Sequence, residues 1–379
     1  MTGALLLALL AQIGAPGERA ALDSAARRYE AIAAAEDWKV LRPGSILEAG
    51  SRGAEVAALR DRLRVEGYPL ANGDTIAQFD TALEQAVLRF QRLHGLREDG
   101  RVGPATLAAL NVPASVRVAQ IRANLARLDS AGPELGARYL RVNIPAFSIE
   151  LIERDRAIWR SRVIVGRTDW PTPVLSTRIA ALTFSPAWII PKSIAIEEIL
   201  PAQRRDPTYL ERAGIRVYAD SAGGTELPAS TIDWDALTPA TFAYQLVQPP
   251  GPQNPLGGVK FFMATPFAVF LHDTPTRALF DQWPGTLSHG CIRLEHPEWL
   301  VQYLLPAWPS DSIVAAMAGQ TERAVELPDP IRIHLIYRTA WTEADGAVAF
   351  REDWYGLDRP PSGPSTGPNR AGFRWRSGG

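Results

Sequence analysis

Hydrophobic residues in this chain of 379 residues follow two different spacings, and the change between them occurs near residue 139. Upstream of that point they recur every three or four positions, which is the spacing of one helix face. The clearest example is formed by Val56, Leu59 and Leu63. Downstream, hydrophobic and often β-branched residues alternate with polar ones, as over residues 140–144, and such alternation predicts β-strands. The chain is therefore expected to combine a helical N-terminal part with a mostly-β part, which is an α+β fold.

Turn-forming residues and local composition divide the chain further. Pro43-Gly44 ends a first helical stretch, and a chain of this length is long enough for two or three domains. The last strand, over residues 331–339, is expected to pair with residues 347–351. The expected segments are an N-terminal leader or anchor over 1–17, a helical scaffold over 18–44, a small helical domain over 45–112, a linker helix over 113–137, a mostly-β domain over 138–320, C-terminal strands over 321–358 and a disordered Pro/Gly/Ser-rich tail over 359–379.

The composition is that of a globular protein, with 46% hydrophobic and 21% charged residues. The formal net charge is −1, so the chain has no basic excess and a nucleic-acid partner is not expected. It contains one cysteine, which rules out an intrachain disulfide.

The N-terminus carries a short hydrophobic run over residues 3–15. This run is too short to cross a bilayer comfortably, but it has the length of a signal-peptide core and ends in the small residues Gly14 and Ala15. No Lys or Arg precedes it, so an ordinary buried helix or a mis-set start is the alternative. We expect an exported protein, whose membrane association, if any, would be through this segment only.

The single cysteine, Cys291, lies in the segment Ser-His-Gly-Cys-Ile-Arg over 288–293, and fifteen residues lie between His272 and that segment. A thiol attacks as its thiolate, and a neighbouring imidazole can take the thiol proton. The two groups could settle as a thiolate and an imidazolium. Gly290 allows the backbone to approach a substrate carbonyl, and the N–H groups near it could hold an oxyanion. This pattern indicates acyl transfer through a thioester.

Two alternatives exist for these residues. A free cysteine is often a small buried hydrophobic residue, although the glycine before Cys291 and the nearby histidines favour a nucleophile. A zinc site would need closely paired ligands, which the spacing His289-x-Cys291 does not provide, so no metal or other cofactor is expected. The four groups considered for zinc are His272, His289, Cys291 and His296. The remaining histidines, His94 and His334, are expected to be structural.

The small helical domain resembles the peptidoglycan-binding domain type 1. The resemblance covers about 65 residues. The alternative is a generic three-helix module of unknown ligand, and the domain could bind glycan or have only a scaffolding role. The matching motifs are Gly50-x-x-Gly53-x-x-Val56-x-x-Leu59, Gly67-Tyr68, Phe90-Gln91-x-x-x-Gly95-Leu96 and Asp99-Gly100-x-Val102-Gly103-x-x-Thr106.

The mostly-β part resembles the L,D-transpeptidase catalytic domain, in its large Gram-negative branch. His272 followed by the segment 288–293 matches the signature of that family. Further matching segments are 142–145, 163–167, 172–173, 186–188, 206–210 and 251–257. The resemblance implies a β-sandwich catalytic domain, with an inserted capping subdomain at about 190–250.

The resemblance also implies roles for individual residues. Cys291 is implied as the nucleophile, His272 as the general base, and His289 as an auxiliary group. Gly290 would supply an oxyanion-binding backbone, and Arg293 would shape the pocket and meet a substrate carboxylate. Asp273 could orient His272 through its backbone carbonyl, or its side chain could cap a turn. The substrate-binding candidates are Trp188, Asn254, Asp273 and Ser288.

The reaction that the resemblance implies is peptidoglycan cross-linking in the periplasm during cell wall biogenesis. The cysteine would attack a diaminopimelate carbonyl of a donor tetrapeptide stem, release D-alanine, and pass the acyl group to an acceptor amine in a 3→3 cross-link. The resemblance also implies acylation by carbapenems. Two alternatives remain, namely an L,D-carboxypeptidase that hydrolyses the same acyl-enzyme and an inactive peptidoglycan-binding protein. The acceptor is open among a second stem, a lipoprotein lysine and a free D-amino acid.

Overall fold

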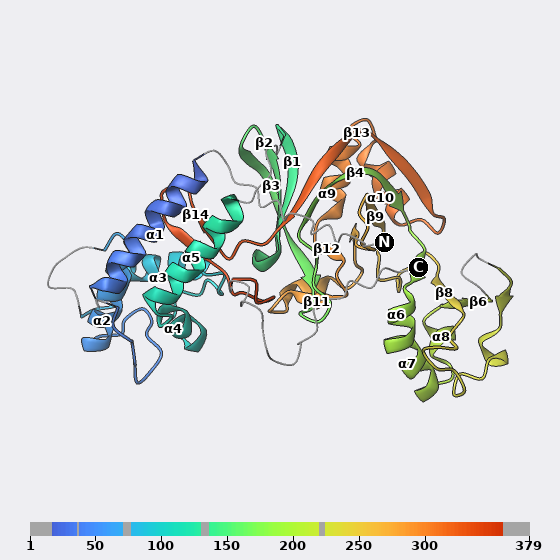
Figure 1. Cartoon of the computed structure of the whole chain (residues 1–379), viewed down its shortest axis with the longest axis horizontal. Coiled ribbons are helices and arrows are strands. Elements are labelled where there is room, and N and C mark those ends of the chain that lie inside the picture. Colours follow the sequence, from blue (N-terminus) through green and yellow to red (C-terminus); the bar gives the residue numbers. More distant parts are fainter. Residues whose placement is uncertain (1–16, 36–37, 71–76, 130–135, 220–223, 359–379) are drawn as a thin grey trace, which may run out of the picture. The chain divides into compact units, whose positions relative to one another are not determined.

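A computed structural model describes residues 17–35, 38–70, 77–129, 136–219 and 224–358 of the chain (Figure 1). The chain divides into two compact units. The first comprises residues 1–134, 143–146 and 336–366, and the second comprises 135–142, 147–335 and 367–379. The expected leader, apart from residue 17, and the expected tail over 359–379 lie outside the described residues.

The first unit is built mainly from helices. Asp80 caps the third helix, as its side chain accepts a hydrogen bond of 2.9 Å from the Leu83 N–H. Pro104 occupies the first turn of the fourth, where its missing N–H costs nothing. The helices are α1 (Glu18–Ala34), α2 (Ala54–Val65), α3 (Thr81–Leu93), α4 (Pro104–Leu110) and α5 (Ala114–Asp129).

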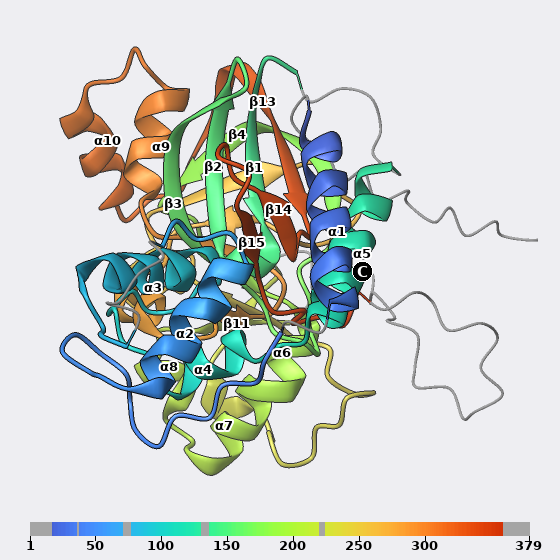
Figure 2. The same ribbon diagram turned by 90° about the vertical axis from the view of Figure 1, so that its left-hand side faces the viewer.

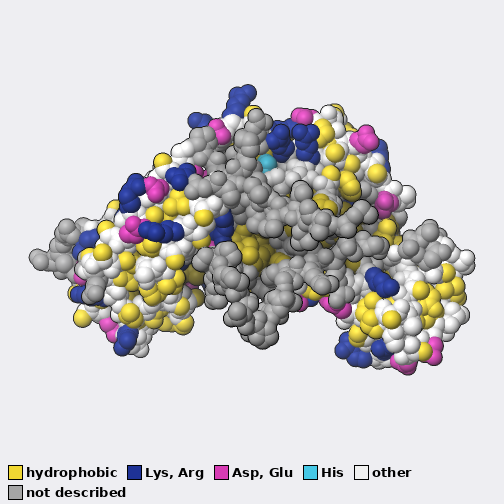
Figure 3. Space-filling view, viewed as in Figure 1, with side chains coloured by type: hydrophobic (Ala, Val, Ile, Leu, Met, Phe, Trp, Pro, Cys, Tyr) yellow, Lys and Arg dark blue, Asp and Glu magenta, His cyan; other side chains and the backbone are white. Residues whose placement is uncertain are grey.

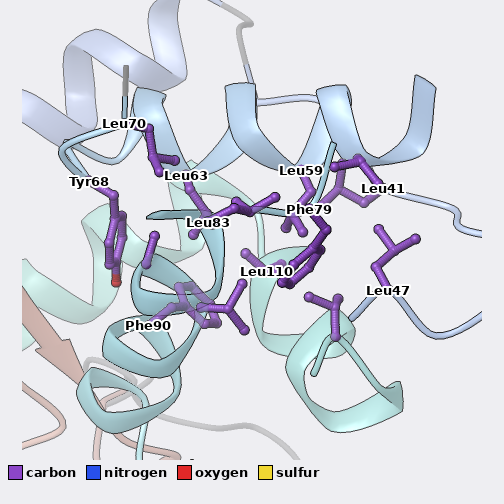
Figure 4. Close-up of a cluster of buried hydrophobic side chains, with 14 of the residues drawn as sticks. Leu41, Leu47, Leu59, Leu63, Tyr68, Leu70, Phe79, Leu83, Phe90 and Leu110 are labelled. Atoms are coloured by element: carbon purple, nitrogen blue, oxygen red, sulfur yellow. The ribbon is translucent and has the colours of Figure 1, made fainter. Parts of the chain in front are cut away.

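Helices α2, α3 and α4 enclose a hydrophobic core, which Figure 4 shows in close-up. Leu59, Leu83 and Phe90 are fully buried in it. These residues recur on the helix faces that the three- and four-residue spacing predicts, so burial of those faces holds the three helices together.

The turn between α3 and α4 is held by one buried amide. The Gln91 side-chain amide donates to Asp99 Oδ1 at 2.8 Å, to the Arg101 carbonyl at 2.9 Å and to Thr106 Oγ1 at 3.1 Å. Its oxygen accepts from the N–H groups of Asp99 and Gly100 at 3.0 and 2.9 Å. Gln91 is 1% exposed, and a buried amide needs this full set of partners.

A second core in the first unit joins α1, α5 and a short hairpin. Figure 2 shows α1 and α5 side by side. The hairpin consists of β14 (Ala340–Thr342) and β15 (Val348–Phe350), which pair antiparallel. The expected pairing of 331–339 with 347–351 is therefore wrong. A tight turn closed by the Glu343 N–H on the Ala347 carbonyl at 2.8 Å gives β15 a nearer partner.

The second unit contains a nine-stranded sheet in the order β11-β3-β12-β10-β9-β4-β13-β1-β2. Strand β2 also pairs with β3, so the sheet closes on itself. The α+β fold class with a β-rich catalytic part is confirmed, and the expected sandwich takes the form of this one closed sheet. The strands are β1 (Arg138–Asn143), β2 (Ser148–Glu153), β3 (Arg156–Gly166), β4 (Leu175–Phe184), β9 (Val259–Met263), β10 (Leu271–His272), β11 (Thr286–Ser288), β12 (Ile292–Leu294) and β13 (Arg323–Ile336).

Between β4 and β9 the chain forms an insert with its own hydrophobic core, which includes Leu210, Val217 and Phe242. Its four-stranded sheet has the order β5-β8-β6-β7. The strands are β5 (Trp188–Ile190), β6 (Arg216–Tyr218), β7 (Glu226–Leu227) and β8 (Gln245–Gln248). The helices are α6 (Lys192–Ile194), a π-helical turn η2 (Ala195–Ile199), α7 (Leu200–Arg205), α8 (Tyr209–Arg212) and a 3₁₀ turn η3 (Ala229–Thr231).

The second unit is completed by two helices that follow the sheet strands, α9 (Pro297–Leu304) and α10 (Ser310–Met317), and by a 3₁₀ turn η4 (Arg277–Asp281). A further 3₁₀ turn, η1 (Ile144–Ala146), follows β1 and belongs to the first unit. None of the described helices is long and apolar enough to cross a membrane. On the face drawn in Figure 3, basic and acidic side chains are interspersed, in keeping with the net charge of −1.

The buried ring of Phe90 gives a test of the helical core. Replacing Phe90 by Ala removes a fully buried side chain and should lower the free energy of unfolding by about 3–5 kcal/mol. Val116→Ala on α5 is the matched control, because Val116 is 50% exposed and should change the free energy by less than about 0.5 kcal/mol. Urea titration followed by far-UV circular dichroism measures both, and equal effects would contradict the packing described.

Candidate active site

Three neighbouring strands line up the candidate residues. His272, at the end of β10, lies opposite Arg293 on the parallel strand β12 and opposite Lys260 on the antiparallel strand β9. Residues directly opposite each other on paired strands share one face of the sheet. Lys260, His272 and Arg293 therefore form a row across the sheet.

Cys291 belongs to the same face. Leu271 is in register with Ile292, and the Ile292 N–H donates to the Phe270 carbonyl at 2.8 Å, so Cys291 comes opposite Phe270. Side chains alternate along a strand, and Cys291 thus shares its face with Arg293 and His272. Strand spacing of about 4.8 Å and a two-residue offset of about 6.6 Å put the Cys291 and His272 Cα atoms about 8 Å apart, within reach of the two side chains.

The opposite face of these strands is the core of the unit. Phe261, Leu271, Ile292 and Leu294 alternate with the row residues, and each is 0% exposed. The hydrophobic half of the alternation therefore fixes the register, and a slip by one residue would turn the whole row into the core. Cys291 itself is partly exposed.

The tautomer of His272 follows from its partner. Its Nδ1 lies 2.5 Å from the backbone carbonyl of Asp273. A carbonyl can only accept, so Nδ1 carries the proton and Nε2 keeps the lone pair. This is the tautomer that a base for the thiol proton needs, and the Asp273 carbonyl orients the ring as the sequence suggested.

The cysteine and histidine of this structure are both neutral near pH 7. Burial and the positive charge of Arg293 lower the pKa of His272 to about 3. Burial raises the pKa of the Cys291 thiol, and the cations Arg293 and Lys260 only partly oppose that rise. Burial thus disfavours a thiolate–imidazolium pair in the free protein, and the cations that favour the thiolate disfavour an imidazolium beside it.

The Asp273 carboxylate is engaged by the protein itself. It accepts hydrogen bonds from the Gly258 and Thr274 N–H groups at 2.8 and 2.7 Å and pairs with Arg277 at 2.7 Å. A Cβ added to Gly257 would lie 2.4 Å from the same carboxylate. This side chain anchors the loop that carries the base.

The loop before Cys291 is fixed by a chain of hydrogen bonds. Thr172 Oγ1 accepts from the Gly166 N–H at 2.9 Å and donates to the Gly290 carbonyl at 2.8 Å. Ser288 Oγ donates to the Cys291 carbonyl and accepts from the Gly290 N–H at 3.2 Å. Since Gly290 has a φ of 102°, its left-handed backbone suits glycine.

These contacts change the expected oxyanion donors. The Gly290 N–H is used by Ser288, whereas the Cys291 N–H has no partner among the described residues. The Cys291 N–H is therefore a donor that this loop leaves for an oxyanion, and Ser288 is a residue that shapes the loop.

The insert reaches this loop through Glu198. The Glu198 carboxylate, on the π-helical turn η2, lies 2.6 Å from His289 Nε2. Arg167 approaches the same carboxylate at 3.5 Å, and the Trp170 ring packs edge-on against the His289 ring at a centroid distance of 5.1 Å. His289 is thus held away from the row of Lys260, His272 and Arg293.

The other two substrate-binding candidates have structural partners. Asn254 is 1% exposed, its amide donates to the carbonyls of Pro186, Gln248 and Pro249, and its oxygen accepts from the Leu256 N–H. Trp188 is half-buried and packs against the core of the insert. Both residues shape the base of the insert.

The remaining histidines lie apart from the row. His94 is buried at the end of α3 and stacks on Phe90 at 3.8 Å between centroids, and buried His334 contacts Ser176 Oγ at 2.8 Å. His296 is exposed and lies 3.3 Å from Glu298. Among the described residues, no cluster of three or more His, Cys, Asp or Glu side chains could hold a metal ion.

Four residues that were not predicted from the sequence lie beside the candidates. Phe270 lies opposite Cys291. The Lys260 Nζ lies 4.8 Å from the centroid of the Phe270 ring, and the centroids of the Phe262 and Phe270 rings are 6.4 Å apart. The strand alternation of 259–263 against 270–272 could have identified these three residues. No sequence signal distinguishes Glu198 from the adjacent Glu197.

Two parts of the chain match known protein families. Residues 137–320 match the model of the L,D-transpeptidase catalytic domain, and residues 52–110 match a putative peptidoglycan binding domain. The chain carries an L,D-transpeptidase catalytic domain. A putative L,D-transpeptidase of Haemophilus influenzae is 33% identical over 220 residues, which is 58% of this chain and 44% of the relative. The chain thus matches less than half of that relative's length.

Solved L,D-transpeptidases align with this domain only distantly. That of Xylanimonas cellulosilytica is 16% identical, with 78% of this chain and 100% of the other covered and a TM-score of 0.25. That of Stackebrandtia nassauensis is 14% identical, with coverages of 76% and 94% and a TM-score of 0.29. At such scores the alignments support no conclusion about the fold, which rests on the strands and helices themselves.

The electrostatics of the L,D-transpeptidase domain predict how its thiol titrates. We expect iodoacetamide to alkylate Cys291 with a midpoint above pH 8.5, the ordinary value for cysteine, because burial raises the thiol pKa. Lys260→Met should move the midpoint further up, since it removes a cation that favours the thiolate. The midpoint is obtained by measuring the rate of alkylation by intact mass at several pH values between pH 6 and pH 10. Because the chain has one cysteine, the alkylated product is unambiguous.

Lys192→Met is the control for loss of a lysine, because Lys192 is exposed on α6 of the insert. A midpoint for Lys260→Met equal to that of Lys192→Met would contradict the assigned influence of Lys260 on the sulfur.

Proposed function

We propose that this chain is a cysteine-dependent L,D-transpeptidase that forms 3→3 cross-links between peptidoglycan stem peptides through a thioester on Cys291. The observation that carries the proposal is the common face of Cys291 and His272 on adjacent parallel strands, with Nε2 of His272 left as the proton acceptor. A thiol and an oriented base on one face of the sheet are the parts that covalent acyl transfer requires.

The first half of the reaction forms the acyl-enzyme. His272 Nε2 takes the thiol proton as the sulfur attacks the diaminopimelate carbonyl of the donor stem. The oxyanion is met by the Cys291 N–H, and the proton then passes from His272 to the amine of the departing D-alanine. This sequence of proton transfers is supported by the low pKa of His272, because a neutral imidazole can accept the thiol proton when the substrate binds.

Lys260 and Arg293 supply the charge that this half-reaction needs. Both cations lower the pKa of the thiol, so they stabilise the thiolate as it forms. Arg293 is also available to a carboxylate of the donor stem, since its guanidinium is half-buried beside the sulfur. In the second half, an amine of an acceptor stem attacks the thioester, and the cysteine is released.

The matched peptidoglycan-binding domain supports a substrate in the cell wall, where the helical unit would hold the protein on its polymer. We place the enzyme in the periplasm, exported or anchored through its N-terminal segment, with a role in cell wall biogenesis. The reaction as proposed requires no metal or organic cofactor.

The proposal predicts the products made from a disaccharide-tetrapeptide. The protein should release D-alanine and form cross-linked dimers, and intact mass should show one carbapenem bound per chain. Cys291→Ala should abolish both, and His272→Asn should slow acylation by about 10²-fold or more. Mass spectrometry of products and protein measures each effect.

His296→Asn serves as the histidine control, because His296 is exposed and lies outside the row. It should leave the rates within about twofold of the wild type. Tripeptide without dimers would identify a carboxypeptidase instead, and unchanged cross-linking by Cys291→Ala would refute the nucleophile.

A further inference from the structure

The acylation half of the proposed reaction leaves one pair of titratable groups unused. His289, two residues before Cys291, contacts Glu198 of the insert at 2.6 Å through its Nε2. An ionised carboxylate can only accept, so Nε2 carries a proton and Nδ1 has the lone pair. No described residue hydrogen-bonds to that Nδ1. The Glu198–His289 pair thus has the arrangement of a carboxylate that orients a base.

This pair includes the residue two positions before Cys291 but does not belong to the row of Lys260, His272 and Arg293. Glu198 is near enough to Arg293, two residues after Cys291, for its charge to act on that guanidinium. The Glu198 side chain is 44% exposed and that of His289 is 20% exposed, so solvent and ligands reach both. The Trp170 ring fixes the orientation of His289 from the side.

In the acceptor half of the reaction a base must remove a proton from the acceptor, and the residues of the row are not suited to this. An acceptor amine is an ammonium near pH 7, with an ordinary pKa of about 10.4, and it must lose a proton before it can attack. Lys260 and Arg293 repel such a cation. The Asp273 carboxylate is already bound by Gly258, Thr274 and Arg277.

We propose that His289 is the base that deprotonates the acceptor amine and that Glu198 is its positioning residue. This inference rests on the proposed transpeptidase function. The acceptor class is a primary ammonium, which approaches from the side of the insert, whereas the carboxylate-bearing donor lies over Arg293 and Lys260.

The acceptor ammonium gives one proton to His289 Nδ1 and becomes a neutral amine. Its nitrogen attacks the thioester carbonyl, the C–N bond forms and the C–S bond breaks. The nitrogen's second proton passes through His272 to the leaving sulfur, which restores the thiol. His289 then returns its proton to water.

Other charged groups face this pair and set its surroundings. Arg167 lies 3.5 Å from Glu198 and is itself paired with Asp169 at 3.2 Å, while Arg293 approaches from β12. The Glu198 carboxylate therefore lies between the Arg167 guanidinium and the His289 ring. The positive charge on His289 is thus balanced at the moment it forms.

The experiment separates acylation from transfer in the full chain. The acyl-enzyme is first formed with disaccharide-tetrapeptide and timed by intact mass. A disaccharide-tripeptide is then added, which carries the diaminopimelate amine but has no D-alanine to donate. The variants are Glu198→Gln, His289→Asn and the double variant, and Glu197→Gln is the matched control because Glu197 is the exposed neighbour on the same turn.

We expect acylation rates within about twofold of the wild type in all variants. Transfer to the tripeptide at pH 7 should fall by about 10²-fold in His289→Asn and about tenfold in Glu198→Gln. The double variant should be no slower than His289→Asn, because the two residues act as one unit. The losses should shrink as the pH approaches about 10, and hydroxylamine, which is unprotonated at pH 7, should react almost equally with every variant.

A merely structural role for Glu198 would not give this dependence on the acceptor. Transfer by Glu198→Gln equal to that by Glu197→Gln would overturn the inference, and so would an equal loss with hydroxylamine. A loss of acylation in parallel with transfer would also overturn it. Failure of the wild type to form any acyl-enzyme would instead remove the proposed function, and the inference with it.

Discussion

The two residues of β10 are the constraint on which the candidate site depends. Leu271 pairs on both sides, with Phe261 of β9 and Ile292 of β12, and all three are fully buried. Their burial sets the register of three strands at once. His272, Lys260 and Arg293 then lie opposite one another, because each is the sequence neighbour of one of these three buried residues. A very short strand thus aligns groups that are far apart in the sequence.

Burial raises the pKa of the Cys291 thiol, and the charges in that row oppose this rise only in part. Arg293 and Lys260 stabilise an anion on Cys291, but they also oppose a proton on His272. Proton transfer is therefore favourable only when the sulfur forms its bond and the negative charge moves onto the substrate oxygen. A thiol that stays protonated until a substrate binds is also a poor target for oxidants, which matters for a protein that we place outside the cytoplasm.

Much of this could be predicted from the sequence. The change of hydrophobic spacing near residue 139 separated the helical part from the strands. The pairing of 331–339 with 347–351 was wrong because alternation alone does not choose a partner, and the local turn at Glu343 decided it. Cys291 and His272 were identifiable from residue type and spacing. Glu198 was not, since its role depends on where the insert folds back, and its neighbour Glu197 has the same side chain.

The amide of Gln91 has a consequence for how such chains are compared. The residues by which the helical domain resembles its family include Gln91, Asp99, Gly100 and Thr106, and all four belong to one internal hydrogen-bond network. These positions are set by the need to satisfy a buried amide, not by contact with a polymer. A chain can therefore keep the full signature of this domain while its outer surface changes freely. The motif therefore indicates that the domain has this fold. Affinity for a particular glycan is a separate property, which depends on the exposed side chains of the domain.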